Sequence, residues 1–319
     1  MSTLFFRFYT FSSLVPSKSF SPHLFLDALA HSMYYSNVLN NIIMSKKNRS
    51  AKRADKEKSE SVQGSKDKSP YVHQDGKLSR PLDIRERYPL SEKLRVIHEV
   101  AMDKQSKVIM INGFWGTAKS STAVLIALKL MNEKKTSGIV YIRNPLESTA
   151  SGKVGLLPGS LEERMAPYNA ILFDKLNEFL PKCDIDRLKN EGRLECIPVS
   201  FLQGKTFNCK TVIIDEAASM SYDDLLLAIS RIGHYCKVFV IGDSTFQLTI
   251  GARSGFRRFF NYFDDNESKE NGIYTFELKE EADIVRSGLI RFVMTKTGII
   301  PHSSPTLTSD WSPSGNNEN

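Results

Sequence analysis

A glycine-rich turn between two apolar stretches contains the residues of this chain best suited to chemistry. The turn consists of Gly113, Phe114, Trp115, Gly116, Thr117, Ala118, Lys119 and Ser120. Backbone N–H groups in such a turn can cradle phosphate oxygens, and the start of the following helix adds the positive end of its dipole. Lys119 would then reach the outer phosphates, and the hydroxyl of Ser120 would bind Mg²⁺. The alternative is an ordinary strand-to-helix turn that contains glycine.

The residue before the lysine departs from the usual pattern of a phosphate-binding turn. It is Ala118, where glycine is expected. Glycine lets the backbone approach a ligand closely, and alanine adds a methyl group there. Alanine fits without strain if its backbone is right-handed helical, a point that the sequence leaves open.

A second candidate group is the acidic end of a β-branched run at residues 211–217, where Asp215 is followed by Glu216. An unbroken apolar run is typical of a central strand in a buried parallel sheet, whose carboxyl end faces the ligand crevice. We expect Asp215 to orient Mg²⁺ through water and Glu216 to act as general base on the attacking water. The alternative is a solvated acidic helix start. The position of the pair, well after the glycine-rich turn, favours the metal-and-base interpretation.

A third apolar run, residues 237–242, ends in Gly242 and Asp243, and Gln247 follows. A strand end of this kind with a nearby glutamine is similar to the γ-phosphate sensor of helicase-type ATPases. The alternative is a Gly-Asp turn that closes a strand. We therefore predict Gln247 as a sensor.

Length and composition limit the possible architectures. The chain has 319 residues, of which 41% are hydrophobic, enough for one α/β domain of about 200 to 250 residues with tails. The net charge is +7, and residues 44–80 alone carry +6 of it. A basic tail suits nucleic acid, although a solvated, disordered leader is an equal alternative. Four cysteines without a C-x-x-C pair indicate neither a zinc site nor a disulfide framework and fit a cytoplasmic location.

The first 43 residues are rich in Phe, Ser, Leu and Tyr, but their apolar runs are short and interrupted. No apolar span of 18 residues occurs, so we predict no transmembrane helix and no membrane partner. A secretory or organellar signal fits less well, because Arg7 is the one charge near the start. We interpret residues 1–43 as a mis-called N-terminal extension, with the natural start at Met44 or Met33.

Strands and helices alternate between residues 81 and 300, which predicts one domain with a parallel sheet. The expected strands are residues 108–111, 138–143, 194–199, 211–215, 237–242 and 272–278. The expected helices are residues 91–100, 120–135, 161–180, 223–230, 254–263 and 287–297. The predicted fold class is therefore α/β, a three-layer P-loop NTPase sheet with helices on both faces. Residues 44–80 and 301–319 are expected to be disordered tails.

Several further segments, in the order in which they occur, make the chain resemble the PhoH-like family of P-loop ATPases, which is related to the first RecA-like domain of helicases. The resemblance covers roughly residues 88–297. Besides the turn and the acidic strand, the matching segments are residues 156–164 (LLPGSLEER), 201–206 (FLQGKT), 230–233 (SRIG), 254–256 (SGF) and 283–286 (DIVR). The Leu-Pro-Gly and Gly-Lys-Thr segments discriminate best, because P-loop proteins in general lack both.

The resemblance implies a role for each site residue. The residues Gly113 to Ser121 bind ATP and Mg²⁺, Asp215 and Glu216 form the acidic motif, and Gln247 is the sensor. Arg286 is expected to meet the γ-phosphate, with Arg231 or Arg143 as further candidates, either within one chain or across a subunit interface as an arginine finger. A single domain of this kind would act as a homo-oligomer, such as a hexameric ring.

Two more departures from the family pattern accompany Ala118. Three residues separate Asp243 from Gln247 where the family has two, and no glutamine precedes the turn to read adenine. The predicted function is hydrolysis of ATP with Mg²⁺, coupled to remodelling of RNA or single-stranded nucleic acid. The alternatives are a nucleotide-binding interaction module with little or no turnover, and a P-loop small-molecule kinase.

Overall fold

The computed structural model describes residues 78–86, 90–144, 161–245 and 253–300, without the side chains of residues 161–168. All of them belong to one compact unit of the chain. Several predictions fall outside the described residues: the Leu-Pro-Gly segment up to residue 160, Gln247 and the C-terminal tail. Of the predicted tail at residues 44–80, the structure describes the last three residues, from Leu78 to Arg80. Arg80, which the sequence places in the basic tail, already donates a hydrogen bond to Asp184 of the domain.

The centre of the fold is a six-stranded sheet in the order β3-β2-β4-β5-β1-β6, with every neighbouring pair parallel. The strands are β1 (Val108–Gly113), β2 (Ile139–Arg143), β3 (Leu194–Pro198), β4 (Thr211–Asp215), β5 (Lys237–Gly242) and β6 (Ile273–Leu278). Each corresponds to a strand expected from the sequence. Because all strands run the same way, their carboxyl ends share one edge of the sheet, where β5 separates β1 from β4.

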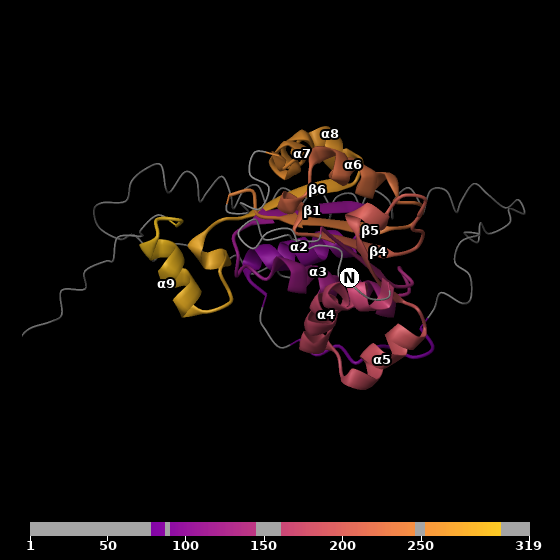
Figure 1. Ribbon diagram of the computed structural model, residues 1–319. Coiled ribbons are helices and arrows are strands. Elements are labelled where there is room, and N and C mark those ends of the chain that lie inside the picture. The colour runs from indigo at the N-terminus through magenta and orange to yellow at the C-terminus, as the bar shows by residue number, and fades with distance from the viewer. Residues whose placement is uncertain (1–77, 87–89, 145–160, 246–252, 301–319) are drawn as a thin grey trace, which may run out of the picture. The chain divides into compact units, whose positions relative to one another are not determined.

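Helices cover both faces of the sheet, which confirms the predicted three-layer α/β fold. Figure 1 shows α2, α3 and α4 on one face and α6, α7 and α8 on the other. The helices are α2 (Glu92–Met102), α3 (Lys119–Asn132), α4 (Leu161–Phe179), α5 (Lys182–Asn190), α6 (Tyr222–Ser230), α7 (Phe256–Tyr262), α8 (Asn266–Glu270) and α9 (Gly288–Lys296). Short 3₁₀ turns are η2 (Val199–Phe201), η3 (Ala217–Ser219) and η5 (Glu281–Asp283).

The apolar strands explain why helices are needed on both sides. Every residue of β4 and β5 is buried, as expected of strands covered on two faces. On the α6 and α7 face, Ile214 and Val240 pack in one core with Phe256. On the opposite face α3 contributes a buried run from Thr122 to Leu128. Among the described residues, none of the helices combines the length and the hydropathy needed to span a bilayer.

Candidate functional site

The turn between β1 and α3 is shaped by two glycines. A Cβ atom on Gly113 would lie 2.6 Å from the carbonyl oxygen of Leu278 in β6, so a side chain is excluded there. Gly116 has a φ of +83°, a conformation that L side chains rarely adopt. Both positions of the predicted phosphate loop therefore require glycine for reasons of backbone geometry.

Ala118 lies in the left-handed region, with φ 56° and ψ 24°. The structure therefore does not have the right-handed helical backbone in which alanine would be unstrained. A left-handed L residue costs roughly 1–2 kcal/mol. Ala118 is also the N-cap of α3, and no side chain caps this helix start. The first turn of α3 therefore presents backbone N–H groups that a side chain does not satisfy.

Lys119 folds back into the loop that precedes it. Its Nζ donates to the carbonyl oxygens of Gly113 at 2.7 Å and Phe114 at 2.5 Å, and to the hydroxyl of Thr117 at 3.3 Å. Burial lowers the pKa of this ammonium group, while the nearby carboxylates, Asp243 first, act in the opposite direction. Lys119 is therefore a buried cation in contact with neutral oxygens, close to the acidic strand ends.

Asp215 connects the end of β4 to the start of α3. The Ser120 hydroxyl donates to Oδ1 of Asp215 at 2.8 Å, and the backbone N–H of Glu216 donates to the same oxygen at 3.0 Å. The hydroxyl of Tyr141 in β2 donates to the other oxygen, Oδ2. The structure thus brings together Ser120 and Asp215, the two predicted metal ligands, although β5 lies between their strands.

Glu216 projects from a left-handed turn directly after β4, with φ 55° and ψ 39°. Its carboxylate is about one-third exposed and lies 3.8 Å from Nη2 of Arg143 at the end of β2. Burial, followed by the charge of Asp215, raises the pKa of Glu216, and Arg143 opposes that shift. A carboxylate with a raised pKa at the ligand-facing edge of a sheet suits a general base.

The end of β5 is joined to the end of β1 through Asn112. The Asn112 side chain donates to Glu277 at 3.0 Å, and its carbonyl oxygen accepts from the backbone N–H of Ser244 at 3.0 Å. The Ser244 hydroxyl is buried and has no hydrogen-bond partner among the described residues. Sequence reasoning missed both Asn112 and Tyr141, although a polar group within an apolar strand was the available signal.

The three predicted arginines lie in different places. Arg143 is at the site, as described, and the backbone N–H of Arg286 donates to the carbonyl oxygen of Gly116 at 3.1 Å. Arg231 ends α6, and its carbonyl oxygen accepts from Phe207, which precedes the start of β4. Arg231 therefore lies toward the amino edge of the sheet. Within its own chain this edge is opposite the turn and the acidic strand ends, and the predicted contact of Arg231 with a γ-phosphate, which allowed for a neighbouring subunit, stays a prediction.

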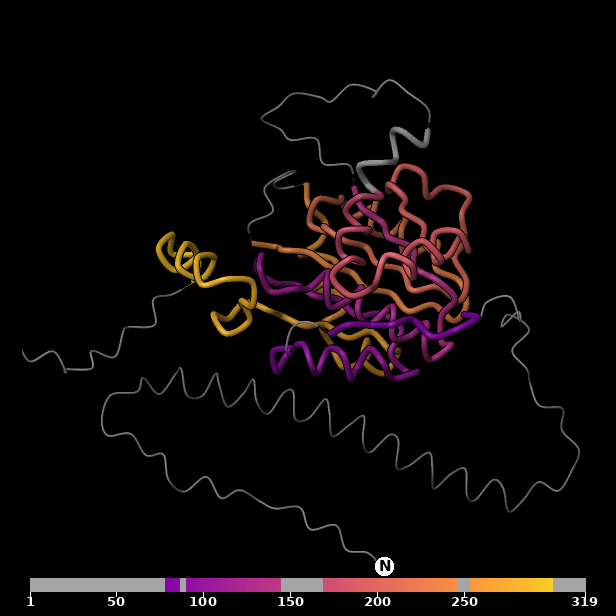
Figure 2. Tube along the Cα trace, turned by 90° about the horizontal axis from the view of Figure 1, so that it is seen from below, coloured from indigo at the N-terminus to yellow at the C-terminus, as the bar shows by residue number. Residues whose placement is uncertain are grey.

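The segment after β6 packs on the glycine-rich turn. Phe114 shares a small apolar cluster with Ile284, Met294 and Ile300. The α9 helix of this segment lies to one side of the sheet in both views (Figures 1 and 2). Trp115, at the tip of the turn, is 36% exposed. The conformation of the turn thus depends on contacts with residues more than a hundred positions later in the sequence.

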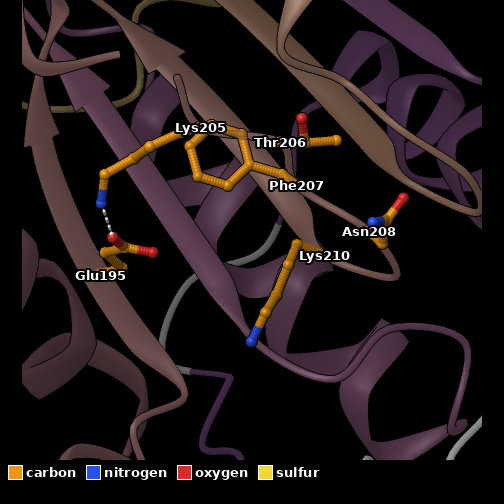
Figure 3. A pocket seen from close by; sticks show the side chains of 6 residues that line it. All are labelled: Glu195, Lys205, Thr206, Phe207, Asn208 and Lys210. Carbon is orange, nitrogen blue, oxygen red and sulfur yellow. Dashed lines mark hydrogen bonds and ion pairs between the residues drawn. The ribbon is translucent and has the colours of Figure 1, made fainter. Parts of the chain in front are cut away.

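A cavity of about 400 Å³ lies elsewhere, and Figure 3 shows its lining. The lining residues are Glu195, Lys205, Thr206, Phe207, Asn208 and Lys210. Lys210 directly precedes β4, so the cavity is at the amino edge of the sheet, opposite Lys119. The Gly-Lys-Thr segment contributes Lys205, whose Nζ lies 2.5 Å from Glu195. The cavity is separate from the acidic strand ends.

A glycine-rich strand-to-helix turn beside an acidic strand end of the same parallel sheet defines the P-loop NTPase class. Residues 91–297 match the family model described as PhoH-like protein, which is more than half of the chain. The chain therefore belongs to the PhoH-like protein family, a family of P-loop ATPases.

Curated relatives agree with this assignment. The PhoH-like protein of Mycobacterium tuberculosis is 31% identical over 176 residues, covering 55% of this chain and 48% of the relative. Protein PhoH2 of Mycolicibacterium smegmatis is 30% identical over 153 residues, 48% of this chain and 35% of the relative. The chain thus matches half or less of the length of these two relatives. The SWI2/SNF2 ATPase core of Sulfolobus solfataricus in complex with dsDNA covers 66% of this chain at 14% identity and a TM-score of 0.37, too distant to bear on function.

Proposed function

We propose that this chain binds ATP with Mg²⁺ at the turn between β1 and α3 and hydrolyses it. The observation that carries the proposal is the 2.8 Å hydrogen bond between Ser120 and Asp215. It joins the phosphate-loop helix to the acidic strand end and places two hard oxygen atoms side by side. Hydroxyl and carboxylate oxygens are the ligand type that Mg²⁺ prefers.

The phosphates of ATP are expected to lie against the turn and the start of α3. Lys119 would exchange its three oxygen contacts for phosphate oxygens, which supply the negative charge that its present contacts lack. The uncapped N–H groups after Ala118, up to Ser121, would bind the same phosphates. Phe114, Trp115 and Thr117 complete the loop.

Two residues would hold Mg²⁺, Ser120 through its hydroxyl and Asp215 through water. The remaining ligands would come from phosphates and solvent, as is usual for this ion. Bound there, the ion would neutralise phosphate charge. Glu216 would accept the proton of the attacking water, a role that its raised pKa supports. Arg143, 3.8 Å from that carboxylate, would orient it.

Other parts of the proposal rest on the family rather than on this site. Arg286 beside the turn, and Gln247 outside the described residues, are proposed to contact the γ-phosphate. Assembly into a homo-oligomeric ring in the cytoplasm, and coupling to RNA or single-stranded nucleic acid, are proposed from family resemblance. The charge of +6 on residues 44–80 supports the nucleic-acid part.

One observation favours a second candidate function, a nucleotide-binding interaction module with little or no turnover. Ala118 occupies a left-handed position inside the phosphate loop. Its methyl group limits how closely the backbone can approach a phosphate. Binding without hydrolysis would follow if that displacement spoils the alignment for the attacking water.

Release of phosphate from ATP distinguishes the two functions. The full chain is compared with Glu216→Gln, which removes the carboxylate but keeps its size, and with Glu195→Gln at the far cavity as the matched control. We expect wild type and Glu195→Gln to turn over alike, and Glu216→Gln to bind ATP without turnover. Equal turnover in Glu216→Gln and wild type would refute the base assignment. Addition of single-stranded RNA tests the coupling.

Binding itself has a built-in reporter. The chain contains two tryptophans, Trp115 in the turn and Trp311 near the C-terminus. In a Trp311→Phe protein, fluorescence comes from Trp115 alone, so a change on addition of ATP reports binding at the turn. Binding without phosphate release in wild type would establish the interaction module instead.

A further inference from the structure

A buried hydroxyl group reaches the acidic strand end from a neighbouring strand. Tyr141 lies in β2 and is fully buried. β2 pairs with β4 so that Tyr141 stands opposite Ile213 and Arg143 opposite Asp215. The Tyr141 hydroxyl donates a hydrogen bond to Oδ2 of Asp215. β2 contributes neither the glycine-rich turn nor the proposed base Glu216. The roles proposed for the turn and for Glu216 therefore do not explain why Tyr141 contacts Asp215.

The contact completes the set of hydrogen bonds that hold the Asp215 carboxylate. Oδ1 accepts from the Ser120 hydroxyl at 2.8 Å and from the backbone N–H of Glu216 at 3.0 Å. Oδ2 accepts from Tyr141. Rotation of the carboxylate about its Cβ–Cγ bond would break bonds at both oxygens, so the group is fixed with Oδ1 toward Ser120.

The chemistry of the phenol suits a permanent donor. A phenol has an ordinary pKa of about 10 and keeps its proton at physiological pH, so the Tyr141 hydroxyl is a donor to the Asp215 carboxylate. Apolar packing alone does not require this oxygen, because phenylalanine fills nearly the same volume. A buried hydroxyl with a charged acceptor is instead typical of groups that orient metal ligands from behind.

We propose that Tyr141 is a positioning residue of the magnesium site: its hydroxyl holds Asp215 so that Oδ1 faces Ser120, and this orientation sets the affinity of the protein–nucleotide complex for Mg²⁺. The inference rests on the proposed function, since it requires that Mg²⁺ binds with a nucleotide at Ser120 and Asp215. Tyr141 itself does not contact the metal or the nucleotide.

The test measures binding rather than turnover. Calorimetry gives the affinity for ADP in EDTA and the Mg²⁺ concentration at half-saturation in the presence of ADP. Loss of an outer hydrogen-bond partner typically lowers metal affinity 10- to 100-fold, so we expect Tyr141→Phe to raise the half-saturating Mg²⁺ concentration about tenfold or more. Affinity for ADP in EDTA stays unchanged. Tyr274→Phe, a half-buried tyrosine of β6, is the matched control and leaves both values unchanged.

A double substitution shows whether Tyr141 acts through Asp215. In an Asp215→Asn background, adding Tyr141→Phe is expected to cause no further rise in the half-saturating Mg²⁺ concentration, because the carboxylate that it orients is gone. A further tenfold rise would contradict the proposal.

Three results would overturn the role of Tyr141. The first is an unchanged half-saturating Mg²⁺ concentration in Tyr141→Phe. The second is an equal loss of ADP affinity with and without metal, and the third is failure of Tyr141→Phe to fold. The second and third results would show that the hydroxyl stabilises the fold instead of positioning Asp215. If wild type binds ADP but Mg²⁺ has no effect on it, the metal part of the proposed function fails and the inference with it. If ADP binding by wild type depends on Mg²⁺ and Tyr141→Phe has the same half-saturating Mg²⁺ concentration, the inference about Tyr141 fails while the proposed function stands.

Discussion

The backbone of Ala118 is left-handed at a position where glycine has no penalty. Ala118→Gly removes the contact between Cβ and the following carbonyl, which costs roughly 1–2 kcal/mol in an L residue. Part of that gain is offset by the greater freedom of glycine in the unfolded chain, by about 0.5–1 kcal/mol. We therefore expect Ala118→Gly to raise the free energy of unfolding by about 0 to 1.5 kcal/mol.

Urea denaturation measures this change, and Ala123→Gly provides the matched control. Ala123 is buried within α3, so glycine there is expected to destabilise by about 1 kcal/mol. A loss of stability in Ala118→Gly similar to that in Ala123→Gly would show that the left-handed backbone carries no strain.

The second residue-scale prediction concerns Lys119. This cation is buried against neutral oxygens, and its lowered pKa reflects the cost of keeping it charged there. We expect Lys119→Met to leave the unliganded protein as stable as wild type or more stable, while stabilisation by ATP is lost. At a ligand concentration of one hundred times Kd that stabilisation is about 2.7 kcal/mol. Thermal unfolding with and without Mg²⁺ and ATP measures both effects. If ATP still stabilises Lys119→Met, the proposed role of Lys119 in binding ATP is wrong.

Sequence reasoning located the turn and the acidic strand end that the structure brings together, because these residues lie at the ends of strongly apolar strands and in a glycine-rich turn. The contact between Ser120 and Asp215 followed from parallel strands sharing an edge. The partner role of Tyr141 could not be predicted, because one hydroxyl in an apolar strand does not indicate which strand lies beside it. The sheet edge at which Arg231 lies could not be predicted for a similar reason, since the edge that a helix end reaches depends on the fold.

At the scale of elements, Lys237 links the start of β5 to the end of α2. Its Nζ donates to the carbonyl oxygen of Asp103 at 2.9 Å, to the hydroxyl of Ser106 at 2.6 Å and to the carbonyl oxygen of Ser106. Burial lowers the pKa of Lys237 to about 7. In the unfolded chain the pKa is about 10.4, so between these values the unfolded chain binds more protons than the folded one.

Stability contributed by Lys237 should therefore rise with pH across that window. It is fully present above the unfolded pKa and is lost as the pH falls toward about 7. We expect the unfolding free energy of wild type minus that of Lys237→Met to increase from pH 7.5 to 9.5, at no more than about 1.4 kcal/mol per pH unit. Urea denaturation at several pH values measures it. Lys104→Met, an exposed neighbour, is the control and should give a constant difference; a constant difference for Lys237→Met would contradict the prediction.

All six strands of the sheet could be predicted, because each is a compact apolar run of the expected length. Two helices were missed, α5 and α8. The α5 sequence is largely polar, and α8 has five residues, too few to show a helical period. The strand order could not be predicted either, because pairing of distant strands leaves no mark within any one of them.

At the scale of the whole molecule, the surface beside the turn is more apolar than an isolated subunit needs. Leu289 and Phe292 of α9 are 70% and 62% exposed, and the exposed Arg286 shortly precedes them. Its backbone is fixed to the turn through Gly116. Exposed apolar groups beside a charged residue are typical of contact surfaces. The proposed ring would place a second copy of the chain against this surface.

We therefore expect Arg286 to act on the nucleotide of a neighbouring subunit. Arg286→Ala should lower turnover about a thousandfold, as for other arginine fingers, and Lys119→Ala should abolish it. Mixed in equal amounts and allowed to reassemble, the two inactive proteins should regain about a quarter of wild-type turnover. Activity needs an intact Lys119 in one subunit and an intact Arg286 in the next, and random mixing in a ring supplies that pair at about one interface in four. No recovery after mixing would place Arg286 in its own subunit's site, since the segment that carries it also contacts its own Gly116.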